Sequence, residues 1–381
     1  MLVSIAHCCA RIGHDVDLYA LSGLSLQSLE RVHGVNLHDQ TGRISTHFVI
    51  DRESVPNGSG GLTNTYPALF ALWGYKSILR KVLNKGNYDL IIFNDDIPKD
   101  VIGKGFTPTS MQYVHFPYAA MASGLVDELL EEYQGSKSKN LPGGSGYSRM
   151  SRFLVGQDSL SGNLVLANSS VTADYIRRVS SSAKPIVLPP SVNLKGLDEQ
   201  ASKVNDVIAV GAFRPNKRFG DLLEAFSKVR NKESTLHIFG LSDWADYLHY
   251  LEVKARKLGL ERRVSLISDA SREEVISGLN RTRTFVSAAQ FEPFGISTVE
   301  ALAAGCDPIA FRGRTSGPWL DTLSKGEFGR GFQTIQELTE ALDDSLSGKR
   351  VASVNVGRAR ATVYDNSHFE ERLVLILGQM L

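Results

Sequence analysis

The fold is decided by the stretch Phe291-Glu-Pro-Phe-Gly-Ile-Ser-Thr-Val-Glu-Ala-Leu-Ala-Ala-Gly305, which joins a loop to a helix. Pro293 restrains the residue before it, and Gly295 can adopt backbone angles that other residues avoid, so the first part of the stretch predicts a loop. We expect Ser297 or Thr298 to cap the helix that follows. The apolar face of that helix would consist of Val299, Leu302 and Ala303.

A glycine loop that opens a helix presents backbone N–H groups at the positive end of the helix dipole. Such a turn suits an anionic or hydroxyl-rich ligand, and the carboxylates of Glu292 and Glu300 flank it. The plainer interpretation is a strand-to-helix turn of an α/β domain with two solvated glutamates, because glycine-opened helices are common. The physical chemistry of the turn leaves both interpretations open.

From Glu292 to Gly305 the sequence closely resembles the Glu-x7-Glu motif of the retaining glycosyltransferases of family 4, which have the GT-B fold. The resemblance implies an α/β chain of two Rossmann-like parallel-sheet domains that face a central cleft. It also implies a nucleotide-sugar site, in which Glu292 lies beside the donor sugar and Glu300 binds the ribose hydroxyls. The other residues of this turn implied in substrate binding are Phe294, Gly295, Ile296 and Ser297.

A basic loop follows the strand predicted over Val207–Gly211 and precedes a helix. Cations on such a loop suit a diphosphate, although a surface turn with solvated cations is the alternative. Family members usually begin this loop with Gly-Arg, whereas this chain has Ala212. Its Phe-Arg-Pro-x-Lys segment instead resembles that of the eukaryotic lipid-linked oligosaccharide α-1,2-mannosyltransferases. We expect Arg214 and Lys217 to bind the donor diphosphate and to act in catalysis with Glu292.

Other strand ends supply the remaining candidates. The resemblance places the nucleotide base near the ends of two strands, where Gly240 and Ile267-Ser268 would hold it largely through the backbone, with Gly211 at the end of the neighbouring strand. His115 follows a strand predicted over Ser110–His115, where open α/β sheets place ligands. A lone histidine is as often structural, but the Tyr-Val-His-Phe-Pro segment resembles the same mannosyltransferases, in which this histidine faces the donor sugar.

Composition narrows the class of protein. The 381 residues suggest two domains, and 42% hydrophobic with 22% charged residues is ordinary for a globular protein. A net charge of +1 gives no general case for nucleic-acid binding. Three cysteines form no disulfide framework and no zinc spacing, which favours a reducing, cytoplasmic compartment. No run approaches the roughly 20 apolar residues of a membrane span, so any membrane contact would be peripheral.

Alternating strand and helix patterns predict the domain organisation. We expect an N-terminal acceptor-side domain over 1–190, a nucleotide-sugar-binding domain over 191–365 and a C-terminal helix over 366–381 that crosses back to the first domain. The chain opens on a helix, Met1 to Gly13, where the family has an earlier strand and glycine-rich loop, so these two elements are expected to be missing. Asp95-Asp96 after a strand could bind a metal or cap a helix, and the basic segment Gln134–Arg152 could meet an anionic acceptor or serve as a solvated linker.

The resemblance therefore implies a metal-independent retaining hexosyltransferase without a cofactor. Its donor would be a GDP- or UDP-sugar and its acceptor a glycan or lipid-linked sugar, with mannose or glucose transferred. Two alternatives stay open. The first is a nucleotide-sugar epimerase on the same fold. The second is a catalytically silent binding subunit, which Ala212 and the missing glycine loop would suit.

Overall fold

The computed structural model describes residues 1–20, 43–48, 88–94, 109–117, 120, 160, 164–198, 200–242 and 244–379. Contacts divide the chain into two units. Unit 1 comprises Met1–Asn168, Thr172–Ser191 and Phe369–Leu381, and unit 2 comprises Ser169–Val171 and Val192–His368. Two features considered from the sequence fall outside the described residues: the pair Asp95-Asp96 and the basic segment Gln134–Arg152.

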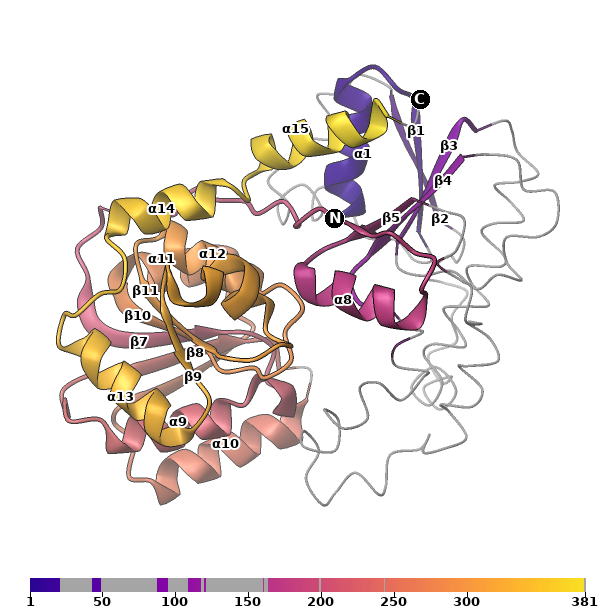
Figure 1. The fold of residues 1–381 in the computed structure, drawn as a ribbon. Helices are drawn as coiled ribbons and strands as arrows, with labels where there is room; N and C mark the ends of the chain where they lie inside the picture. The colour runs from indigo at the N-terminus through magenta and orange to yellow at the C-terminus, as the bar shows by residue number, and fades with distance from the viewer. Residues whose placement is uncertain are drawn as a thin grey trace, which may run out of the picture. The chain divides into compact units, whose positions relative to one another are not determined.

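The described strands of unit 1 are all parallel (Figure 1). β1 (Val16–Ala20) pairs with β2 (Ile44–Phe48). A second sheet has the order β3-β4-β5-β6, and its strands are Leu90–Asn94, Thr109–Val114, Leu164–Ala167 and Ile186–Val187. Parallel pairing agrees with the continuous apolar runs of β3 and β5, since both faces of such sheets are covered. One covering helix is α8 (Ser170–Val179), whose Ala173 and Ile176 are buried with Val165 and Ala167 of β5.

Two helices from opposite ends of the sequence share the core of unit 1. They are α1 (Leu2–Arg11) and α15 (Asn366–Leu377). A glycine in the left-handed region, Gly13 with a φ of 103°, follows the end of α1, and its N–H donates to the carbonyl of Ala10. The apolar face of α15 is buried against α1 and the sheet through Phe369, Leu373 and Leu377. Arg11 and His7 of α1 both contact the carboxylate of Glu370, which fixes α15 along α1.

Unit 2 contains one six-stranded parallel sheet in the order β12-β11-β10-β7-β8-β9. In chain order, β7 to β12 span Val204–Val210, Leu236–Gly240, Val264–Ser268, Thr282–Ser287, Asp307–Phe311 and Arg330–Phe332. The helices span Phe219–Lys228 (α9), Ala245–Lys257 (α10), Arg272–Arg281 (α11), Ile296–Ala303 (α12), Ile335–Leu346 (α13) and Val354–Thr362 (α14). β12, α13 and α14 were not predicted from the sequence.

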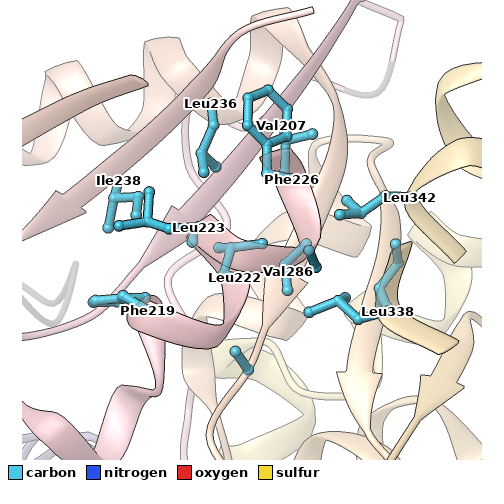
Figure 2. Packing of buried hydrophobic residues seen from close by; sticks show 14 of the residues in the cluster. Val207, Phe219, Leu222, Leu223, Phe226, Leu236, Ile238, Val286, Leu338 and Leu342 are labelled. Atoms are coloured by element: carbon cyan, nitrogen blue, oxygen red, sulfur yellow. The ribbon is translucent and has the colours of Figure 1, made fainter. Parts of the chain in front are cut away.

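Helices cover both faces of this sheet, so its central strands alternate between two apolar cores. On β7, Val207 and Ala209 join the core formed with α9, α10 and α13, while Ile208 joins the core formed with α11, α12 and α14. Figure 2 shows the first core, in which Phe226 of α9 lies among strand residues and α13. Two cores explain why the strands of unit 2 are apolar at successive positions.

None of the described helices is long and apolar enough to cross a membrane.

Phe226 provides a test of the packing in unit 2. Its side chain is fully buried and lies 4.6 Å below the guanidinium of Arg263. We expect Phe226→Ala to lower the free energy of unfolding of unit 2 by about 3–5 kcal/mol, because it removes a ring and leaves a cavity. Urea unfolding followed by tryptophan fluorescence in a Trp73→Phe background measures it, since Trp244 and Trp319 then report on unit 2 alone.

The matched control is Val356→Ala, at an exposed position of α14. It should change the free energy of unfolding by less than about 0.5 kcal/mol. Equal effects of the two substitutions would show that the core described around Phe226 does not stabilise unit 2.

Candidate functional site

The sheet of unit 2 reverses its strand order between β7 and β10. From β7 the chain adds β8 and β9 on one side and then places β10 on the other. The loops that follow β7 and β10 therefore leave neighbouring strand ends in opposite directions, which is where open α/β sheets bind ligands. Arg214 and Lys217 lie on the first of these loops and Glu292 on the second. The topology thus brings the three predicted residues to one edge of the sheet.

Lys217 and Glu292 form an ion pair between the two loops. Their side chains are 23% and 21% exposed, so the pair is partly removed from water and its attraction is stronger than on an open surface. A lysine ammonium has three N–H donors. The bond to Glu292 uses one of them and leaves donors for the oxygens of an anionic ligand.

Two glycines allow the strand ends to approach closely at this edge. A Cβ on Gly211 would contact Cδ and Cε of Lys217 at 3.4 Å, so the aliphatic part of Lys217 crosses the bare backbone there. A Cβ on Gly240 would lie 2.3 Å from the carbonyl oxygen of Gly211, which no side chain can occupy. Gly240 pairs in register with Ser268, and Phe239 pairs with Ile267. The four predicted strand-end residues therefore line the ends of three neighbouring strands.

The cations of the basic loop after β7 differ in their exposure and in their partners. Arg214 is exposed and precedes the single turn η3 (Pro215–Lys217). Arg218 has a φ of 51° and begins α9, and its guanidinium binds Asp221 at 2.7 Å and Gln290 at 3.3 Å. Gln290 lies on the loop after β10, so Arg218 is a second link between the loops. Arg218 was not among the residues predicted for the site, although it stands directly beside Lys217.

A third loop, between β11 and β12, holds the backbone of Glu292. The N–H of Glu292 donates to the carbonyl of Thr315 at 3.1 Å, and the N–H of Gly317 donates to the carbonyl of Glu292 at 2.7 Å. A Cβ on Gly317 would lie 2.0 Å from the carbonyl oxygen of Pro293. Glycine is required at 317 because the backbones of the two loops are in direct contact. This contact fixes the backbone position from which the side chain of Glu292 extends.

The predicted helix cap was wrong. Gly295, with a φ of 82°, is the N-cap of α12, while Ser297 and Thr298 lie inside its first turn. The left-handed conformation of Gly295 lets the chain enter the helix directly, two residues earlier than a serine cap would. No side chain among the described residues caps the helix, and Ile296 is 47% exposed. The N–H of Thr298 donates to the carbonyl of Gly295 at 3.0 Å, so the N–H groups of Ile296 and Ser297 are the ones that this terminus could offer to a ligand. Phe294 is buried against Tyr364 instead of facing this terminus.

Glu300, the second glutamate of the motif, is almost fully buried in α12. Its side chain is 8% exposed, and its Oε1 atom lies 2.6 Å from Nη1 of Arg272. Burial raises the pKa of Glu300, and the neighbouring Arg272 opposes that rise. Arg272 was not among the predicted site residues, because nothing in the sequence pairs the first residue of α11 with a glutamate of α12.

His115 lies in unit 1, within the part of the chain that the structure describes. It directly follows β4, and its Nε2 atom lies 3.1 Å from the side-chain oxygen of Asn94, at the end of β3. The imidazole packs edge-on against Tyr113, with 5.3 Å between ring centroids. Burial lowers the pKa of His115 to about 4, so the ring is neutral at pH 7. A neutral imidazole can both donate and accept a hydrogen bond.

Comparisons with known proteins bear on the family and on the fold. Residues 198–352 match the family model "Glycosyl transferases group 1". The matched region, which covers most of unit 2, therefore resembles the group 1 glycosyltransferases. A sucrose-phosphate synthase structure from Thermosynechococcus elongatus matches 100% of this chain and 92% of its own with a TM-score of 0.72 at 18% identity. This similarity confirms the predicted GT-B fold, an α/β fold with parallel sheets in both units.

Two curated relatives of this chain differ in the sugar that their names give. A "GDP-Man:Man(3)GlcNAc(2)-PP-Dol alpha-1,2-mannosyltransferase" from Candida albicans is 30% identical over 43% of this chain and 30% of its own length. An "Alpha-1,6-glucosyltransferase" from Actinobacillus pleuropneumoniae is 27% identical over 44% of this chain and 50% of its own. The chain spans half or less of the length of these two relatives.

The neutral imidazole of His115 can be tested by NMR. In the intact protein we expect its signal to stay in the neutral position from pH 8 to about 5 and to titrate near pH 4, because burial disfavours the charged ring. Carbon-labelled histidine with His115→Asn to assign the signal measures it.

The same shift affects stability. An unfolded chain binds this proton near pH 6.5 and the folded one only near 4, so the His115 contribution is present above pH 6.5 and is lost as the pH falls toward 4. A titration midpoint near 6.5 in the folded protein would contradict the burial described for this ring.

Proposed function

We propose that the chain is a retaining glycosyltransferase that moves a hexose, mannose or glucose, from a nucleotide-sugar to a glycan or lipid-linked acceptor. One observation carries the proposal. The loops after β7 and β10 bring Lys217 and Glu292 into an ion pair just before the open start of α12. A cation, a carboxylate and free helix N–H groups in one place suit a ligand that has both phosphates and hydroxyls.

Each group has a role in the proposed reaction. The bond between the sugar C1 and the diphosphate oxygen breaks, and its electron pair leaves with the nucleoside diphosphate. The acceptor hydroxyl forms the new bond to C1, and its proton passes to an oxygen of the departing diphosphate. Arg214, Lys217 and the first N–H groups of α12 would stabilise the charge on the departing diphosphate, which is preorganised electrostatic stabilisation. No metal ion is part of the proposal.

The two carboxylates would bind the sugar parts of the donor. Glu292 would accept hydrogen bonds from hydroxyls of the transferred hexose, and Glu300 from the ribose hydroxyls. The backbone of Phe294, Gly295, Ile296 and Ser297 would reach the sugar and the phosphates. Strand ends at Gly211, Gly240, Ile267 and Ser268 would hold the base. In unit 1, the neutral His115 would form a hydrogen bond with the donor sugar.

The donor is proposed to be GDP-mannose, with a UDP-sugar as the alternative. The Phe-Arg-Pro-x-Lys segment resembles that of the lipid-linked oligosaccharide mannosyltransferases, and the Candida albicans relative has GDP-mannose in its name. The Actinobacillus pleuropneumoniae relative is named as a glucosyltransferase, so glucose is the alternative to mannose as the transferred sugar. The proposed site of action is the cytoplasm, with any membrane contact peripheral.

Nucleotide binding tests the site. We expect GDP or UDP to bind the full chain with a micromolar Kd, and Lys217→Ala and Glu300→Ala each to weaken it at least about tenfold, near 1.4 kcal/mol. Lys217→Ala removes a cation from the phosphates, and Glu300→Ala removes the acceptor for the ribose hydroxyls. Isothermal titration calorimetry with both nucleotides measures the effect and identifies the base.

The control is Lys228→Ala, at an exposed lysine of α9 that pairs with Glu224 on the surface. It should leave nucleotide affinity unchanged. If the folded wild-type chain binds neither nucleotide, the proposal fails and a silent subunit becomes the better hypothesis. Isomerisation or hydrolysis of a nucleotide-sugar without any acceptor would favour the epimerase.

A further inference from the structure

Arg272 is held at both ends of its guanidinium in unit 2. Nη1 lies 2.6 Å from Oε1 of Glu300, and Nη2 donates to the carbonyl of Asn193 at 3.2 Å. Its side chain is 27% exposed, against 8% for Glu300. The guanidinium is therefore fixed to the backbone on one side and to a buried carboxylate on the other.

The position of Arg272 opposes local helix electrostatics. Arg272 is the first residue of α11, where the helix dipole is positive and a cation is unfavourable. The same turn has a capping box, in which the Ser271 hydroxyl accepts from the N–H of Glu274 and the Glu274 carboxylate accepts from the N–H of Ser271. The capping box fixes where Arg272 leaves the helix. Its pairing with Glu300 is the contact that compensates a cation at this terminus.

The carboxylate of Glu300 has a second oxygen. Arg272 occupies Oε1, and in the part of the chain that the structure describes Oε2 accepts no hydrogen bond. An ionised carboxylate accepts through both oxygens, whereas a protonated one also donates. Two ribose hydroxyls are donors, so they need the ionised form.

We propose that Arg272 is a positioning residue of the nucleotide site: it orients the Glu300 carboxylate so that Oε2 faces the ligand, and it keeps that carboxylate an acceptor. The inference rests on the proposed function, in which Glu300 binds the ribose. Arg272 itself acts through Glu300 and does not touch the nucleotide. The relevant ligand class is a nucleotide whose ribose has free 2′- and 3′-hydroxyls.

The surroundings of Glu300 leave this role to Arg272. Burial raises the pKa of Glu300, and Arg272 is the one charged group that lowers it among the described residues. Charged side chains on the other elements packed against α12 have partners other than Glu300. Arg358 donates to the carbonyls of Ala303 and Leu197, and Arg360 donates to those of Asp321 and Thr322. Arg283 binds Asn205, Asp307 binds Arg330, and the carboxylate of Asp321 accepts a hydrogen bond from a backbone N–H. Without Arg272, burial would act on Glu300 unopposed.

The pH profile of nucleotide binding tests the proposal. For the nucleotide that binds the wild type, affinity should change less than about twofold between pH 6 and 8.5. In Arg272→Met the affinity should be lower, and the loss should grow at least about tenfold as the pH falls over that range, because Glu300 takes up a proton. Arg272→Lys should restore most of the flat profile. Calorimetry at four pH values with full-length variants measures it.

Two further variants distinguish positioning from a general effect on structure. Arg272→Met combined with Glu300→Gln should bind no more weakly than Glu300→Gln alone, because Arg272 acts only through that carboxylate. Arg281→Met makes the same substitution at an exposed arginine of α11 and should keep the wild-type profile. A pH-independent loss in Arg272→Met, or a double variant weaker than Glu300→Gln, would overturn the proposal.

Thermal unfolding reports on the pair without any nucleotide. A carboxyl group whose folded pKa lies above its unfolded value of about 4.5 stabilises the fold at low pH and ceases to do so as the pH rises through the folded pKa. Arg272→Met should therefore lose Tm more steeply than the wild type between pH 5 and 8, and Glu300→Gln should abolish that slope. An unchanged slope would overturn the coupling. Absence of nucleotide binding by the wild type would instead overturn the proposed function, and with it the role of Arg272 there.

Discussion

The ion pair between Lys217 and Glu292 depends on two strands being neighbours. The two residues are 75 positions apart in the sequence and lie on loops after β7 and β10. If the four strands β7 to β10 lay side by side in chain order, the ends of β7 and β10 would be three strand spacings apart, roughly 14 Å, and side chains from short loops would not meet. The reversal of strand order removes that separation. The charge arrangement of the site is thus a consequence of topology.

The two glutamates of the motif are held in different ways. Glu292 is partly exposed and pairs with a flexible lysine, so a ligand can take over some of the donors of that lysine. Glu300 is buried, and its pair with Arg272 could not separate without leaving a charge in a poorly hydrated place, which is strongly unfavourable. One pair can exchange partners when a ligand arrives, and the other stays as a fixed part of α12 and α11.

The sequence was sufficient for most strands and for the residues of the switch-point loops. The strand predicted over Ser110–His115 corresponds to β4 within one residue at each end, and the strand predicted over Val207–Gly211 corresponds to β7, which begins three residues earlier. Contacts across the fold were not predictable in this way. Nothing local shows that Arg272 meets Glu300, or that Gly317 lies against Pro293, because each contact joins loops from different strands. The N-cap of α12 was predicted wrongly for a local reason. Serine and threonine are common N-caps, but Gly295 adopts the left-handed conformation and is the N-cap, two residues before Ser297.

Under the proposed function, the Lys217–Glu292 pair also bears on which ligand the site favours. A diphosphate alone would draw Lys217 toward itself and leave Glu292 less well compensated in a partly dehydrated position. A sugar attached to that diphosphate brings hydroxyl donors for Glu292 at the same time. A complete nucleotide-sugar therefore satisfies both members of the pair, while its fragments satisfy one. Because the backbone of Glu292 is fixed by the loop between β11 and β12, these hydroxyls must come to the carboxylate, and the pair selects for a donor with correctly placed hydroxyls.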